Sequence, residues 1–107
     1  MTTYGDIFEV ILGKAYYNQG FFNIRIKHSN SIGSAGQHIT VQLGDKPDHK
    51  LVGYINRTAN PNKTPRIMLG KGYTDWIKRH FKPKDSLRVE ILTKTALILH
   101  DKKSTKA

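Results

Sequence analysis

Two tyrosines and two amides stand beside a lysine in the segment from Lys14 to Gly20, KAYYNQG. Asparagine and glutamine present a donor and an acceptor side by side, which matches the exposed edge of adenine, and hydroxyls bind phosphate oxygens. A tight turn at Gly20 is the alternative interpretation, but such a turn needs neither the tyrosines nor the lysine. The segment therefore predicts hydrogen-bonding contact with a polar ligand.

A second segment, from Arg57 to Arg66 (RTANPNKTPR), combines two prolines, two asparagines and three cations and holds nothing that could build a core. Arginine and lysine pair with guanine as asparagine pairs with adenine, so this mixture also suits contact with bases. An idle surface loop is the alternative, because Asn and Pro are ordinary loop residues. The density of cations favours binding.

The candidate contacts fall into two groups. Base or backbone contacts are assigned to Tyr16, Tyr17, Asn18, Gln19, Arg57, Asn60, Asn62, Lys63 and Arg66. Phosphate contacts are assigned to Lys14, Arg25, Lys27 and Lys71, because these cations flank the two segments, where charge is useful and geometry is less demanding.

Positive charge is concentrated in the second half of the chain. The whole chain has 18 Lys and Arg against 8 Asp and Glu, a net charge of +10. Residues 1–56 contain five basic and four acidic side chains, whereas residues 57–107 contain thirteen and four. A polyanion, most commonly nucleic acid, is the natural partner of such a surface. A solvated basic surface without a specific ligand is the alternative that net charge leaves open.

No catalytic or metal-binding motif is complete. His80-Phe81-Lys82 matches the start of the phospholipase D motif, but Leu87 stands where that motif needs an aspartate. The five histidines are never three to five residues apart, so no metal-binding pair is visible. We therefore expect no enzymatic activity, no metal and no cofactor.

Composition indicates one intracellular, cytoplasmic domain. The 107 residues suit a single core, and the absence of cysteine excludes a disulfide framework and fits a reducing compartment. No basic leader or long apolar run is present, so we expect no membrane segment. Residues 1–5 are predicted as an extension, 6–99 as the domain and 100–107 as a basic disordered tail.

Hydrophobic periodicity predicts seven short strands and one clear helix. The strands are expected at 7–12, 22–26, 39–43, 51–56, 66–69, 86–92 and 96–99. The first two should form a hairpin with KAYYNQG at its tip, and residues 28–37 should form a loop with one short helical turn. A helix is expected over 73–81, with Thr74 as its cap and Pro83 after its end.

The predicted fold is mainly β, a mostly antiparallel barrel or sandwich, because parallel strands need helical crossovers. Aromatic residues that alternate with β-branched residues usually pack inward. We therefore assign Phe21, Phe22, Trp76 and Phe81 to the core, and Tyr4 and Tyr54 to packing.

The order of these elements, the two polar segments and the stretch KPKDSLRVEIL (82–92) resemble the B3-type DNA-binding pseudobarrel. The similarity is greatest to the effector domains of some restriction endonucleases and extends more distantly to plant B3 transcription factors. The family's usual Gly-Asp in that stretch is Lys84-Asp85 here. The resemblance implies a seven-stranded open pseudobarrel that recognises double-stranded DNA with sequence preference. Residues 14–20 (the first arm) and 57–66 (the second arm) would enter the major groove, and a nuclease domain or subunit would be a partner.

Two other functions remain open from sequence. A small basic barrel could bind RNA, and it would then use exposed aromatic residues on a sheet face as stacking platforms. A nuclease subunit with unrecognised catalytic residues is the second alternative.

Overall fold

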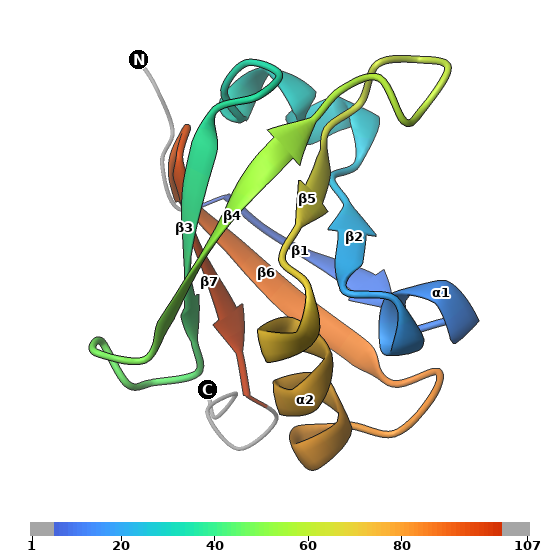
Figure 1. Ribbon diagram of the computed structural model, residues 1–107, viewed down its shortest axis with the longest axis vertical. Coiled ribbons are helices and arrows are strands. Elements are labelled where there is room, and N and C mark those ends of the chain that lie inside the picture. Colours follow the sequence, from blue (N-terminus) through green and yellow to red (C-terminus); the bar gives the residue numbers. More distant parts are fainter. Residues whose placement is uncertain (1–5, 102–107) are drawn as a thin grey trace.

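One seven-stranded mixed sheet, nearly closed into a barrel, dominates the computed structural model, which describes residues 6–101 (Figure 1). The strands are β1 (Asp6–Ile11), β2 (Phe21–Asn23), β3 (His38–Leu43), β4 (Lys50–Asn56), β5 (Arg66–Met68), β6 (Ser86–Thr93) and β7 (Ala96–His100). Their order in the sheet is β1-β6-β7-β3-β4-β5-β2, and every neighbouring pair is antiparallel except β3 and β7. The predicted mainly β, mostly antiparallel open barrel is confirmed. The extension 1–5, with Tyr4, and residues 102–107 of the predicted tail lie outside the described residues.

The barrel stays open between β1 and β2, which are the two ends of the strand order. The predicted hairpin of these two strands is therefore wrong. The connection folds as a helix, α1 (Lys14–Asn18), and β2 pairs with β5 instead. Arg25 spans the opening, because its Nε and Nη2 donate to the carbonyl oxygen of Glu9 at 3.2 and 2.8 Å. A side chain thus joins two segments that no strand pairing joins.

Helices cover both ends of the barrel. Figure 1 shows α1 and α2 (Lys71–His80) at one end, and η1 (Ile26–Ser31), a 3-10 helix, with the second arm at the other end. The α2 helix begins two residues earlier than predicted, after Gly70, so Thr74 is not its cap. Its Tyr73, Trp76 and Ile77 side chains are buried against the sheet. No helix within residues 6–101 is long and apolar enough to cross a membrane.

The core follows the two-residue alternation of the strands. Phe22, Ile67 and Ile55 lie opposite one another across β2, β5 and β4, and all are fully buried. Trp76 and Phe81 also lie in the core, as predicted.

Three positions break the predicted inward packing. Phe21 lies outside the buried core, because its neighbour Phe22 takes the inward position on β2. Tyr54 is 45% exposed, because Ile55 faces inward on β4. Ile26 is 68% exposed, because β2 ends at Asn23 and the chain enters η1 rather than continuing the predicted strand.

Candidate nucleic-acid interface

The first arm is attached to α2 by two tyrosine hydroxyls. Tyr73 Oη donates to the carbonyl oxygen of Tyr16 at 3.0 Å, and Tyr17 Oη donates to the carbonyl oxygen of Phe81 at 3.2 Å. Burial raises the pKa of the Tyr73 hydroxyl, so this group stays a neutral donor. The short α1 helix is therefore held by tertiary contacts, which a helix of its length needs in order to be stable.

Two glycines bring the end of the first arm against the start of α2. The amides of Leu69 and Gly70 both donate to the carbonyl oxygen of Gly20 at 2.9 Å. Gly20 and Gly70 have φ angles of 76° and 79°, which glycine adopts without steric cost. A Cβ on Gly20 would lie 2.9 Å from the Gly70 Cα. The predicted contact role of KAYYNQG therefore rests on a fixed frame and not on a free loop.

The polar side chains of the first arm point to solvent. Lys14, Asn18 and Gln19 are exposed. Asn18 Nδ2 donates to the carbonyl oxygen of Lys14 at 2.9 Å, which leaves its Oδ1 available. The Tyr16 ring meets Phe21 edge to face, with ring centroids 5.9 Å apart, while the Tyr17 ring packs against the core. Of the predicted contacts in this arm, the lysine and amides are accessible and the tyrosines mainly position them.

The second arm is organised around Arg57, whose guanidinium makes five hydrogen bonds. Nε donates to the Gly33 carbonyl at 2.9 Å. Nη1 donates to Ser29 Oγ and to the Lys63 carbonyl, and Nη2 donates to the Ser29 and Ile32 carbonyls. Because a guanidinium has five N–H groups, every donor is used. The predicted reading of guanine by Arg57 would require these bonds to break.

Two asparagine side chains also hold the second arm from within. Asn62 Oδ1 accepts from Thr64 Oγ1 at 2.8 Å and from its amide at 3.3 Å. Asn56 Oδ1 accepts from the Thr58 and Ala59 amides at 2.9 and 3.0 Å, as Asx turns do. The exposed tip carries Lys63, with a φ of 63°. The arm is thus a preformed projection with a cation at its tip.

Asn23, Asn60 and Arg66 form an amide network that joins the second arm to the end of β2. Asn23 Oδ1 accepts from Asn60 Nδ2 at 3.0 Å and from Arg66 Nε at 3.1 Å, and Arg66 Nη2 donates to Asn60 Oδ1 at 3.4 Å. The Arg66 guanidinium also lies over the Phe21 ring, 4.2 Å from its centroid. Asn23 Nδ2 and Arg66 Nη1 make no hydrogen bond within residues 6–101, so the network holds two available donors in a fixed arrangement.

Asn23 is the member of this network that sequence reasoning missed. The signal for its role is its register, because Asn23 lies directly opposite Arg66 on β5.

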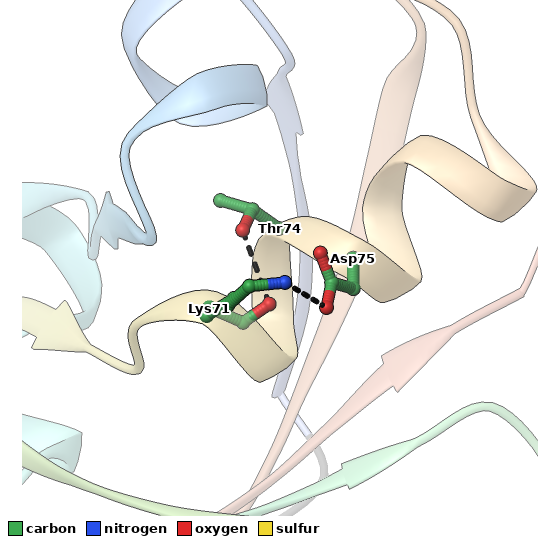
Figure 2. A network of polar contacts seen from close by, with 3 residues as sticks. All are labelled: Lys71, Thr74 and Asp75. Atoms are coloured by element: carbon green, nitrogen blue, oxygen red, sulfur yellow. Dashed lines mark hydrogen bonds and ion pairs between the residues drawn. The ribbon is translucent and has the colours of Figure 1, made fainter.

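The predicted phosphate contacts do not share one environment. Lys14 and Lys27 are exposed, whereas Arg25 is engaged across the barrel opening. Figure 2 shows the Lys71 ammonium directed at Asp75, with Nζ 2.9 Å from Oδ2, and Thr74 Oγ1 donating to the Lys71 carbonyl at 3.1 Å. The Lys71 side chain is 84% exposed, so this i,i+4 pair is weak and leaves the cation accessible.

No carboxylate occurs in residues 10–44 or 49–74, which contain both arms, the amide network and eight Lys and Arg residues. The acidic residues belong to β1, the β3–β4 turn, α2 and the segments after it. The segments that form the arms therefore contribute positive charge only, which favours a polyanionic ligand.

The chemistry available at this face is recognition by hydrogen bonding and charge. Within residues 6–101, no group of three or more His, Cys, Asp or Glu side chains could hold a metal ion. No protein-family model, curated protein or solved structure matches the chain.

Proposed function

We propose that this domain binds double-stranded DNA with sequence preference and has no chemistry of its own. The observation that carries the proposal is the amide network of the second arm, in chain segments (10–44 and 49–74) that lack Asp and Glu and also include the first arm. Lysine and arginine side chains of these segments supply attraction to phosphates, and preorganised amide and guanidinium groups supply discrimination between bases.

The amide network is the proposed base reader. Asn23 and Asn60 fix the Arg66 guanidinium, whose Nη1 is available for a guanine edge. The exposed Asn18 and Gln19 amides of the first arm are the second set of reading groups. Arg57 then has the separate role of shaping the second arm, because its five donors are already engaged.

Exposed lysines of both arms, together with other Lys and Arg side chains of the basic second half, would anchor the phosphates. With roughly six to eight phosphate contacts in all, the affinity for DNA should fall about 1,000-fold between 50 and 200 mM salt. A response that stays flat with salt would contradict the proposal. As the resemblance to restriction-enzyme effector domains implies, a nuclease domain or subunit would supply cleavage, and the module would act in the cytoplasm where DNA is accessible.

Selection from a randomised duplex pool at about 150 mM salt tests the proposal, since non-specific binding is weak there. A short consensus is expected. Arg66→Ala should then cost about 1–3 kcal/mol on the selected site and relax the preference at one position. Lys46→Ala, an exposed cation in the turn between β3 and β4, is the matched control. Recovery of random sequences would reject sequence preference.

A further inference from the structure

A row of two aromatic side chains, a methionine and a histidine crosses the outer face of the sheet beside the amide network. Phe21 on β2 lies opposite Met68 on β5, Met68 lies opposite Tyr54 on β4, and Tyr54 lies opposite His38 on β3. We call these four residues the outer row. On β4, Val52 and Asn56 stand two residues before and after Tyr54. Their side chains therefore point to the same outer face as Tyr54, because side chains alternate along a strand.

The outer row is accessible where the core rows are not. Tyr54 is 45% exposed and Val52 is 69% exposed, whereas Ile55 between the outward positions is fully buried. His38 is also exposed. An aromatic ring, a valine and a histidine gathered on one exposed sheet face form an apolar patch within a basic surface, and such patches commonly mark contact sites.

An open hollow of about 470 Å³ adjoins the outer row. Its lining includes Val52, Gly53, Tyr54, Met68 and Leu69. The hollow exists because β5 ends at Met68 and the chain turns at Gly70 into α2, so residues 50–53 of β4 pair with β3 on one side and with no strand on the other. A flat ring entering this hollow would meet the Tyr54 side chain and the backbone of Gly53.

Cations frame the outer row, and carboxylates are absent from its strands. Arg66 lies over the Phe21 ring at one end, and Lys50 is exposed two residues before Val52 on β4. Strands β2, β4 and β5 fall within the segments that lack Asp and Glu, and so does β3. Aromatic side chains inside a positively charged groove are the combination that binds single-stranded nucleic acid, because bases stack on the rings while the cations follow the backbone.

We infer that the outer row is a second binding site, which takes unpaired nucleobases of single-stranded DNA or RNA by stacking on Tyr54. The site adjoins the proposed duplex interface at Phe21 and Arg66 and extends beyond it, since His38 and Tyr54 belong to neither arm. Its ligand chemistry is a planar base on a phosphate backbone, which single-stranded DNA and RNA share.

Fluorescence anisotropy of labelled dU and rU dodecamers, which differ only at the 2′ position of the sugar, tests the inference at about 150 mM salt. Tyr54→Ala should weaken binding on the order of 10-fold or more, whereas Tyr54→Phe, which keeps the ring, should bind like the wild type. Comparison of the two oligomers shows whether the sugar is distinguished. Ile11→Ala, which shortens a 56% exposed apolar residue on β1, is the control and should have no effect.

Two further readouts keep the outcomes distinct. Photocrosslinking of an iodouracil-containing strand should label Tyr54 or His38, and thermal unfolding should show that the variants are folded. Equal binding by wild type and Tyr54→Ala, or no binding of either oligomer by the wild type, would overturn the inference. Loss of duplex binding in parallel with single-strand binding would also overturn it, because the row would then belong to the duplex interface. Failure of the duplex selection alone would leave the single-strand result intact.

Discussion

The two arms contain similar residue types but use them in opposite ways. In the first arm, backbone and tyrosine contacts with α2 hold the segment, and the lysine and amides are exposed. In the second arm, arginine and asparagine side chains hold the segment, and Arg57 has no donor left for a ligand. A polar side chain in a projecting segment is therefore a candidate contact only after its internal hydrogen bonds have been counted.

Removal of the Arg57 side chain should cause the largest loss of unfolding free energy among the variants below. It tests whether Arg57 holds the second arm in place. Arg57→Ala leaves carbonyl groups of η1 and the second arm without their donors, so we expect a loss of about 2–4 kcal/mol of unfolding free energy. Urea unfolding measures it. Arg57→Lys should recover only part of the loss, since one ammonium cannot reproduce a five-donor fork. Unchanged stability with altered preference at a single base would instead make Arg57 a reader of guanine.

A methyl group on Gly20 should cause the next largest loss of unfolding free energy. It tests whether the close contact between Gly20 and Gly70 holds the first arm. Gly20→Ala combines a φ of 76° with an approach of 2.9 Å to Gly70, so we expect a loss of about 2–3 kcal/mol in the same assay. Gly36→Ala is the matched control, because its φ is 86° but nothing lies within 4 Å of the added Cβ. The control should lose about 1 kcal/mol. Equal losses in both variants would mean that the contact between Gly20 and Gly70 does not hold the arm.

Tyr73→Phe sharpens the comparison by removing one hydrogen bond from the first arm. We expect a loss of about 1 kcal/mol below pH 9, because the Tyr16 carbonyl loses its buried donor. The folded-state pKa of Tyr73 is raised above its ordinary 10.0, so the wild type should lose stability as pH rises past that value. The Tyr73→Phe variant should not show this part of the loss of stability at alkaline pH.

Urea unfolding between pH 8 and 11 measures the Tyr73 effect. Tyr54→Phe is the control, since the Tyr54 hydroxyl donates no hydrogen bond within residues 6–101. Identical alkaline losses in wild type and Tyr73→Phe would show that the Tyr73 hydroxyl does not contribute.

Neutralisation of one cation in each arm should leave the unfolding free energy unchanged and change only the salt dependence of DNA binding, by a small amount. If both arms bind DNA as proposed, Lys14→Gln and Lys63→Asn should each lower the slope of log affinity against log salt by about 1. Asparagine is chosen at position 63 because it tolerates the φ of 63° there. Lys46→Gln should leave the slope unchanged. A change in only one variant would show that a single arm contacts phosphate.

Strand positions could be predicted from sequence because alternation reports which face of a strand is buried. The predicted ends of the strand at 39–43, for example, differ from the observed β3 by one residue. Alternation does not identify the partner of a strand, so β1 and β2 were wrongly paired. The end of β2 was also missed, because it depends on the chain leaving the sheet for η1 and on Arg25 reaching Glu9.

The location of the candidate site stays a prediction, and the hydrogen bonds of each residue could not be read from sequence. Residue types mark both arms, and the lysines of both arms, Lys14 and Lys63, are exposed. The role of Arg57 depends on Ser29, which is 28 residues away in the chain, and the role of Asn23 depends on its register with Arg66. Local sequence contains neither relation, because both arise from the closure of the barrel.

The position of β6 and β7 within the sheet sets the order in which the chain can fold during synthesis. These strands come last in the described sequence, yet they lie between β1 and β3, and β7 pairs Ala96 with Thr40 in parallel. A nascent chain that has not yet emerged to β6 offers β1 no partner, and until β7 emerges β3 is paired on one side only. Such distant pairings make folding slow. The barrel can therefore close only after nearly all of the domain has left the ribosome, and until then the unpaired edges of β1 and β3 are available to chaperones.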